Sequence, residues 1–332
     1  MEDRRPGLDP AVAEVRRAVR AALAGVPEGS VVVIALSGGA DSLALAAAAA
    51  FEAPRAGLTA AAVTVDHGLQ DGSADAAAAA SAQARALGLD ARVVRAAVGT
   101  DGGPEAAART ARYAALRAAA STLPATAILA GHTLDDQAET VLLGLARGSG
   151  AASLQGMAES TDLDGVTLLR PLLGVRRATT RAACRAEGLE PWEDPHNTES
   201  RFARVRVRES VLPVLEAELG PGIAEALART AAQLREDAEA FDEMIDETIE
   251  DIVEHVEAGI SVSVGALAAN PAALRHRIIR HVVASEFHES LTRAQTLQVA
   301  RLVIDWAGQG PIDLPGCRAR RVGGRIEFTA RP

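Results

Sequence analysis

The stretch Val31-Val-Val-Ile-Ala-Leu-Ser-Gly-Gly-Ala-Asp-Ser42 decides the fold of this 332-residue chain. Its first six residues form an apolar, β-branched run that is typical of a buried strand. The glycine pair permits a tight turn, and the alanine-rich residues that follow favour a helix. N–H groups at the start of such a helix bind anionic oxygens, and the two serines add hydroxyl donors. The pattern predicts a strand–loop–helix unit that binds phosphate through the loop Ser37–Ser42.

The aspartate inside this loop constrains what the loop binds. Asp41 would repel a bare phosphate, so its presence indicates an intervening Mg²⁺ ion. An ordinary glycine-rich turn with an Asp/Ser cap is the alternative interpretation. The loop is neither a Walker loop, because no Gly-Lys-Ser/Thr follows, nor a G-x-G-x-x-G dinucleotide fingerprint.

Strand-like and helix-like segments alternate on either side of the loop. Further apolar runs lie at residues 59–65, 91–95, 127–130 and 166–169, and alanine-rich helical stretches lie near 42–52, 74–87, 104–120 and 134–146. Apolar strands alternating with helices are typical of a parallel sheet covered on both faces. The sequence predicts an α/β fold with a Rossmann-like parallel sheet.

The composition changes at Val211-Leu-Pro213, which sets the predicted domain boundary. Residues 216–257 have helical periodicity, further helices are expected at 271–287 and 292–306, and a small hairpin is expected at 316–328. We therefore predict one domain over 1–212 and a smaller, mainly helical domain over 213–332.

The charge distribution is compatible with a nucleic-acid partner. The formal net charge is −10, which argues against such a partner at first. The charge is unevenly distributed, however, because residues 170–208 are rich in arginine and residues 236–257 are rich in acids. Further basic clusters occur at 275–281 and 318–325, and the sequence contains no lysine. Arginine alone supplies the fixed positive charge for any RNA contact.

Cysteine usage and hydropathy exclude several classes of protein. The two cysteines, Cys184 and Cys317, form no C-x-x-C pair and lie in no His/Cys cluster, which disfavours disulfide, zinc and iron–sulfur chemistry. No apolar run is long enough to span a bilayer, and the charged start is unlike a secretion signal. The sequence predicts a cytoplasmic protein with no membrane partner.

Four further segments identify a family resemblance. They are Val65-Asp-His-Gly-Leu69, Glu105–Tyr113, Gly131–Thr140 with Arg147–Gly150, and Arg170–Leu173 with Asp194–Asn197 and Phe202–Arg208. Together with the loop, their order and spacing closely resemble the tRNA(Ile)-lysidine synthases, which belong to the N-type ATP pyrophosphatases. The match runs from about Val31 to Pro213.

The resemblance implies an ATP-dependent carbon–nitrogen ligase, with an ATP-binding adenylation domain over 1–212 and a substrate-recognition domain over 213–332. Such an enzyme joins free L-lysine to C2 of the wobble cytidine of the CAU-anticodon tRNA(Ile). The cytidine is first adenylated by ATP, and AMP and pyrophosphate are released. Cytidine becomes lysidine, which changes the codon and amino-acid specificity from methionine to isoleucine. The implied cofactors are ATP as co-substrate and Mg²⁺, and the oligomeric state is left open, with a homodimer as one option.

The resemblance also implies roles for particular residues. The expected catalytic residues are Asp41, Arg112, His132 and Asp136. ATP is expected to contact Ser37, Gly38, Gly39, Ala40, Asp41, Ser42, Val65 and His67. Asp41 and Asp136 would share the Mg²⁺ ion, and Arg109, Arg204 and Arg208 would bind tRNA. His132 and Asp136 are four residues apart around a helix start, so they are able to face one site.

Structural interpretations of these residues remain open. The Arg109–Arg112 pair also fits a solvated helix face, and His132 fits a hydrogen-bonded core histidine. Asp66 and His67 would serve equally well as a strand cap. Arg204, Arg206 and Arg208 alternate as in a strand or lie in a loop, either as RNA contacts or as plain surface. Val205 stands where the family usually has asparagine, which leaves Arg206 without a role.

Two other functions compete with the ligase. A tRNA thiolase of the same superfamily would need a cysteine pair, and Cys184 and Cys317 fall in different predicted domains. A non-catalytic nucleotide sensor would keep the loop but has no need of Asp41, His132 and Asp136 together. Both alternatives are distinguished from the ligase by lysine-dependent turnover.

Overall fold

The computed structural model describes residues 7–68, 72–96, 99, 104–148, 150–194, 199–257 and 259–331. Leu69, Ser149, the Pro195–Asn197 segment and the side chain of Glu105, all within the motifs above, lie outside the described parts. The chain divides into two compact units, Met1–Leu234 and Arg235–Pro332.

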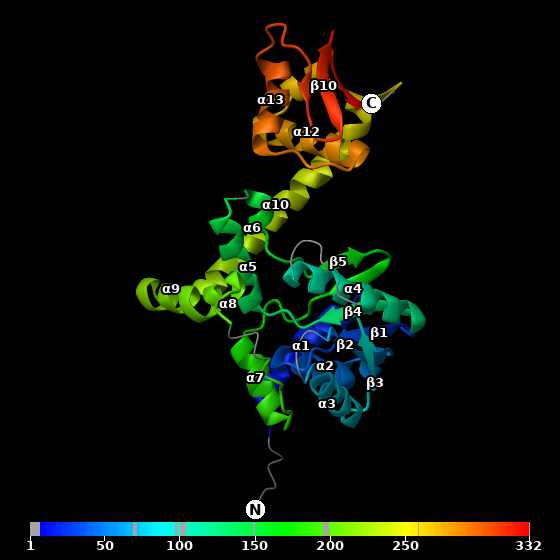
Figure 1. Ribbon diagram of the computed structural model, residues 1–332, viewed down its shortest axis with the longest axis vertical. Helices are drawn as coiled ribbons and strands as arrows, with labels where there is room; N and C mark the ends of the chain where they lie inside the picture. Colours follow the sequence, from blue (N-terminus) through cyan, green and yellow to red (C-terminus); the bar gives the residue numbers. More distant parts are fainter. Residues whose placement is uncertain are drawn as a thin grey trace, which may run out of the picture. The chain divides into compact units, whose positions relative to one another are not determined.

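The first unit is built on a six-stranded sheet (Figure 1). Its strands are β1 (Val31–Ala35), β2 (Thr59–Asp66), β3 (Asp90–Arg95), β4 (Ala125–Ala130), β5 (Ser160–Leu163) and β6 (Val166–Leu169). The order is β3-β2-β1-β4-β6-β5, and every pairing is parallel except that of the edge strand β5 with β6. The predicted Rossmann-like parallel sheet is confirmed. The carboxyl ends of β1, β2 and β4 therefore lie at one edge, where an open α/β sheet binds ligands.

Helices cover both faces of this sheet. On one face, α1 (Pro10–Leu23), α2 (Ala40–Glu52), α3 (Ser73–Ala86) and α7 (Arg177–Ala186) share a core with the sheet, and α4 (Pro104–Thr122) does so on the other. The helices α5 (Leu134–Ala146) and α6 (Ala151–Leu154) pack against each other. Val32 and Ile34 of β1 pack into the core beneath α1, α2 and α7, whereas Val33 points to the opposite face and packs with Leu116 of α4. The alternation follows from the two-residue period of a strand. The alanines of α2 are buried, so this helix packs closely on the sheet.

The first unit extends beyond the boundary at 212 that the composition suggests. The chain continues through α8 (Ala203–Arg206), the π-helical turn η3 (Val207–Val211), α9 (Leu212–Leu219) and α10 (Ile223–Ile252). Leu212 and Ala224 are buried in one apolar cluster with Leu134 and Ala138 of α5. Because of this packing, the first unit extends to Leu234.

The second unit combines helices with an antiparallel sheet. Its elements after α10 are β7 (Val253–Val256), β8 (Gly259–Ser263), α11 (Val264–Ala269), α12 (Ala272–Phe287), α13 (Arg293–Ile304), β9 (Ile312–Asp313), β10 (Cys317–Val322) and β11 (Arg325–Ala330). The sheet order is β7-β8-β11-β10-β9. The expected hairpin is thus β10–β11, but it lies in the middle of a five-stranded sheet, so the unit is less helical than the composition predicts. Val253–Val256, expected to be helical, pairs with β8 instead.

Within the described residues, no helix combines the length and the apolar character that a membrane span requires.

Candidate active site

The loop Ser37–Ser42 connects the end of β1 to the start of α2. The Ser42 Oγ accepts a hydrogen bond from the Ser37 backbone N–H at 3.1 Å and donates one to the Gly39 carbonyl at 3.0 Å. The Ser37 and Ser42 hydroxyls are also 3.1 Å apart. Gly39 caps α2 without a side-chain hydrogen bond, so no side chain occupies the helix N-terminus. The closed loop therefore presents backbone donors to an anion.

Two glycines allow the surrounding chain to approach the loop. Gly38 has a φ of 86°, and a Cβ added there would lie 3.2 Å from the Cβ of Ala80 on α3. A Cβ on Gly131, after β4, would lie 3.0 Å from the backbone oxygen of Asp41. The Gly38 carbonyl also accepts a hydrogen bond from the Trp192 N–H at 2.9 Å. Neither glycine accommodates a larger residue without displacing the loop.

Asp41 projects from the first turn of α2 toward α7. Its Oδ1 accepts a short hydrogen bond from the Thr180 hydroxyl, and its Oδ2 lies 3.5 Å from Nε of Arg177. Burial raises the pKa of Asp41, although Thr180 and Arg177 oppose that rise. The carboxylate is therefore held in place by the neighbouring helix while a quarter of its side chain, 24%, stays open to solvent.

Asp136 lies at the start of α5 as part of a capping box. Its Oδ2 accepts hydrogen bonds from the Thr133 N–H at 2.8 Å and from the Thr133 hydroxyl at 2.9 Å. Burial opposes ionisation of Asp136, but Arg177 and the Thr133 hydrogen bonds outweigh that effect and hold its pKa below the usual value. Asp136 is accordingly an ionised carboxylate at neutral pH.

Three carboxylates and two arginines form a single cluster. Arg177 lies 2.7 Å from Asp136 and 3.1 Å from the fully buried Glu139, in addition to its contact with Asp41. Arg208 lies 2.7 Å from Glu139 and 3.5 Å from Asp136. The cluster therefore joins α2, α5, α7 and η3, and it carries one more negative than positive charge.

The cluster bears directly on the expected Mg²⁺ site. The Arg177 guanidinium bridges Asp41 and Asp136, and the second oxygen of Asp136 is held by Thr133. In the described part of the chain, no group of three or more acidic, histidine or cysteine side chains has the arrangement of a metal site. A Mg²⁺ ion shared by the two aspartates does not fit this arrangement, because the Arg177 guanidinium already lies between their carboxylates.

His132 lies between β4 and α5, close to several arginines. Burial lowers its pKa to about 4, and Arg170, Arg109 and Arg204 reinforce that shift against the opposing charge of Asp136. Its Nδ1 is buried and has no hydrogen-bond partner within the described residues. His132 is neutral at physiological pH and unlike a core histidine whose two nitrogens are both satisfied.

A second histidine meets an arginine where β2 ends. Arg112 of α4 directs its Nε to the Nε2 of His67 at 3.3 Å. The side chain of Arg112 is exposed overall, but its guanidinium is partly desolvated, and this desolvation lowers its pKa. The positive charge of the nearby Arg109 lowers the pKa further. Within the described part of the chain, Arg112 makes no ion pair. Asp66, by contrast, accepts hydrogen bonds from the Gly68 N–H and the Ser73 hydroxyl and so closes the turn after β2.

Comparisons with known proteins agree with this geometry. Residues 12–215 match the profile of the PP-loop domain, and residues 263–327 match that of the TilS substrate binding domain. The tRNA(Ile)-lysidine synthase of Leifsonia xyli subsp. xyli is 60% identical over 302 residues, which cover 90% of each chain. That of Thermobifida fusca is 51% identical and covers 98% of this chain and 99% of its own.

This chain belongs to the tRNA(Ile)-lysidine synthase family. Membership makes it a tRNA-processing ligase, and the PP-loop domain accords with ATP binding. The U34-tRNA thiolase NcsA from Methanococcus maripaludis, with 20% identity and a TM-score of 0.57, covers 68% of this chain and 79% of its own. At that identity it shares the fold alone.

The structure distributes the expected residues of the tRNA(Ile)-lysidine synthase site over two groups. Asp41 and Asp136 meet in the carboxylate cluster. His67 and Arg112 meet at the end of β2, where Val65 is half-buried. Arg109 is exposed and stacks 5.1 Å from the Tyr113 ring centre.

The basic segment at 204–208 is helical, unlike the strand or loop expected for it. Arg204 and Arg206 lie on α8, and Arg208 lies on η3. Arg208 is held by Glu139 inside the cluster, which differs from the expected place on an RNA-facing rim. Arg206 donates to the backbone carbonyls of Ser200 and Arg201.

Sequence reasoning missed Arg177, Thr180 and Glu139. Glu139 follows Asp136 by three residues, a spacing that places both on one helix face, and this signal was available. Arg177 and Thr180 lie on α7, a helix hidden within an arginine-rich stretch and not predicted. Their contact with Asp41 arises from packing of α7 on α2, for which the local sequence offers no signal.

Several basic residues of the second unit have partners within that unit. Arg318 and Arg320 of β10 form ion pairs with Asp313 and Glu327, each at 2.8 Å. Arg325 is paired with Glu254 at 3.0 Å. Arg275 is buried, and its Nη1 donates to the Leu267 and Asn270 carbonyls. Most of the hairpin arginines therefore serve the fold of this unit.

Proposed function

We propose that this chain modifies the wobble cytidine of a CAU-anticodon tRNA(Ile) in two steps. The cytidine O2 attacks the α-phosphorus of ATP, which breaks the bond to pyrophosphate and leaves an adenylated cytidine. The ε-amine of free L-lysine then attacks C2, the C2–O bond breaks, AMP leaves and the amine loses a proton. The main support for this proposal is that the anion-binding loop, which includes Asp41, lies beside the α5 carboxylates.

The loop supports the adenylation step. Its helix N-terminus has no side-chain cap and faces the edge of the sheet, so Ser37–Ser42 would stabilise charge that develops on the phosphates. Arg112 carries a positive charge that no ion pair neutralises in the described part of the chain, and an ATP or RNA phosphate would supply its counter-charge. Neutral His67 and His132 would act as hydrogen-bonding groups rather than as cations. ATP would enter with Mg²⁺ as its counter-ion.

A pocket beside the cluster supports the use of a free amino acid. This cavity of about 160 Å³ is lined by Asp135, Glu139, Arg176, Arg177, Arg208, Leu212, Pro213, Glu216 and Ala224. Both signs of charge line it, which suits an amino acid that carries a carboxylate and an ammonium group. We assign the lysine carboxylate to the arginines and the ε-ammonium to the acids. The ammonium must lose a proton before it attacks, and a neighbouring carboxylate is its acceptor.

The competing thiolase chemistry has no support in this chain. Cys184 and Cys317 lie in separate units, and both thiols are fully buried. Burial raises the pKa of each to about 11, so neither forms a nucleophilic thiolate near neutral pH. ATP, tRNA and free lysine occur together in the cytoplasm, and we place the protein there.

The reaction is tested by following pyrophosphate release with purified tRNA(Ile). Three reactions contain lysine, no amino acid, or a sulfur donor in place of lysine. We expect AMP and modified tRNA to accumulate only with lysine. Accumulation with the sulfur donor would identify a thiolase, and ATP binding without turnover in all three would identify a nucleotide sensor.

A further inference from the structure

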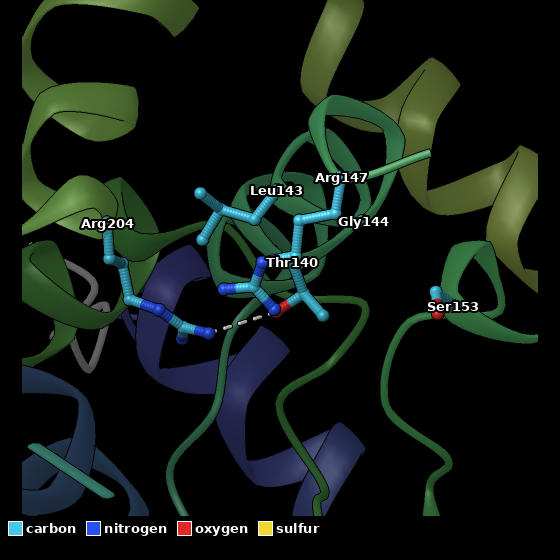
Figure 2. A pocket seen from close by; sticks show the side chains of 6 residues that line it. All are labelled: Thr140, Leu143, Gly144, Arg147, Ser153 and Arg204. Carbon is cyan, nitrogen blue, oxygen red and sulfur yellow. Dashed lines mark hydrogen bonds between the residues drawn. The ribbon is translucent and has the colours of Figure 1, made fainter. Parts of the chain in front are cut away.

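A second cavity of the first unit lies along α5, separate from the carboxylate cluster. Its volume is about 250 Å³, and it is lined by Thr140, Leu143, Gly144, Arg147, Ser153 and Arg204 (Figure 2). Three α5 residues and the C-cap residue Arg147 follow the i, i+3, i+4, i+7 spacing of a single helix face. The cavity is therefore a feature of α5, closed by α6 on one side and by α8 on another.

The polar groups of this cavity favour an anion. Arg147 and Arg204 supply two guanidinium groups, Thr140 and Ser153 supply hydroxyls, and no carboxylate is among the lining residues. Arg204 reaches from α8 toward the Thr140 hydroxyl at 3.4 Å, as Figure 2 shows, and Thr140 donates to the Asp136 carbonyl. Neither arginine forms an ion pair in the described part of the chain. Other arginines of this unit, such as Arg177 and Arg208, are neutralised by acids.

The wall that α6 provides is set by a glycine. A Cβ on Gly144 would lie 2.5 Å from the backbone oxygen of Ser153, so only glycine allows α6 to pack this closely on α5. This packing fixes Ser153 at the cavity edge, opposite α8. Leu143 supplies the one large apolar side chain of the lining. The shape and the donor set thus depend on residues that the adenylation site does not use.

We propose that this cavity binds one backbone phosphate of the substrate RNA through Arg147 and Arg204. The proposal rests on the tRNA modification proposed above. Paired guanidinium groups bind phosphate through charge-assisted hydrogen bonds, and unpaired arginines retain their full charge for it. Thr140 is four residues from Asp136, about 6 Å along the helix axis, so the phosphate belongs to a nucleotide near the target base. An RNA phosphate is favoured over free nucleotide because the loop Ser37–Ser42 already supplies an ATP site.

The test measures tRNA binding by the full chain at several salt concentrations. The variants are Arg147→Gln, Arg204→Gln and the double variant, with Arg92→Gln as a matched control because exposed Arg92 pairs with Asp90 on β3. Each single substitution should weaken tRNA binding roughly tenfold at low salt, since a hydrogen bond to a charged group is lost. The double variant should lower the slope of log K against log salt by about 0.7, as expected for one phosphate of a single strand.

Further measurements distinguish an RNA-phosphate site from a free-nucleotide site and from a folding defect. ATP and pyrophosphate affinities without tRNA should match those of the wild type, and a parallel loss would identify a free-nucleotide site and overturn the proposal. Arg147→Lys and Arg204→Lys keep the positive charge, so both variants should retain the wild-type salt dependence of tRNA binding. An unchanged tRNA affinity in the double glutamine variant would also overturn the proposal. Thermal unfolding identifies any variant that fails to fold, in which case the lysine variants decide. Lysine-dependent turnover by the wild type tests the parent function independently.

Discussion

The Thr180 hydroxyl of α7 donates a hydrogen bond to Oδ1 of Asp41 at the start of α2. Thr180 is itself fully buried, and its hydroxyl also lies 2.8 Å from the Arg177 carbonyl. The two residues are far apart in sequence, so the orientation of the loop aspartate depends on how α7 packs. This contact connects the phosphate-binding loop to the carboxylate cluster.

Replacing Thr180 with valine should impair adenylation through Asp41. Valine has nearly the same shape but no hydroxyl, so Asp41 would lose its orienting donor while the packing of α7 survives. We expect tRNA-dependent pyrophosphate release to fall roughly tenfold, in line with the loss of one hydrogen bond to a charged group. Thr180→Ser is the matched control and should retain most activity. Wild-type rates for Thr180→Val would exclude a positioning role for this hydroxyl.

Removing Arg177 should destabilise the first unit. Glu139 is fully buried and Asp136 nearly so, and Arg177 is the cation that contacts both together with Asp41. Arg177→Gln would leave buried negative charge only partly compensated by Arg208, at a cost of about 3 kcal/mol in the free energy of unfolding. Denaturant unfolding measures this cost. Adding Glu139→Gln in the same chain should restore part of the loss, and an unchanged unfolding midpoint for Arg177→Gln would contradict the ion-pair account.

His132 should make stability depend on pH below neutrality. Its pKa is lowered to about 4 in the fold, so the unfolded chain binds a proton more readily than the folded one between pH 6.5 and 4. The contribution of neutral His132 is present above pH 6.5 and is lost as the pH falls through that window, by about 3 kcal/mol in all. His132→Asn should flatten this dependence, whereas His255→Asn on exposed β7 should preserve it. If the free energy of unfolding depended on pH equally in the two variants, the lowered pKa of His132 would be refuted.

The arginines of α12 and α13 should bind tRNA more strongly than those of the β10–β11 hairpin. Arg280 has a pKa lowered by partial burial and by the neighbouring Arg277 and Arg293, which signals uncompensated positive charge. No ion pair is made by these three residues within the described part of the second unit. The triple substitution by glutamine should weaken tRNA binding and its salt dependence.

Arg318→Gln with Arg320→Gln is the comparison for that experiment. These hairpin arginines already have carboxylate partners, so their replacement should change tRNA affinity little. A larger loss from the hairpin pair than from the α12–α13 triple would reverse this assignment. Circular dichroism spectra of both variants establish that the second unit has folded.

The strands and the loop were predictable because their signals are local. The run Val31–Leu36, the glycine pair and the alanine-rich helix each favour one conformation, and the structure adopts it. The strand β8 was missed because its partner β11 follows some sixty residues later, so its stability depends on nonlocal pairing, and β7 pairs with β8 alone. A short run such as Val253–Val256 carries too little pattern of its own to be distinguished from the end of the preceding helix.

The candidate site was predictable only in part for a related reason. Asp41, His132 and Asp136 lie at the ends of predicted elements, so the topology of a parallel sheet brings them to one edge. The partner that separates the two aspartates, Arg177, comes from a helix whose arginine-rich sequence reads equally well as exposed surface. Periodicity identifies neither its burial nor its contacts with both aspartates.

The most direct test of the central claim is the intact mass and nucleoside analysis of a CAU-anticodon tRNA(Ile) after reaction with the enzyme, ATP and isotopically labelled lysine. We predict that one labelled lysine is attached to the first anticodon nucleoside, with one AMP and one pyrophosphate released per modified tRNA. We also predict that Asp41→Asn abolishes both products without unfolding the chain. Unlabelled tRNA from an enzyme that nevertheless consumes ATP, or label at any other nucleoside, would contradict the proposed reaction.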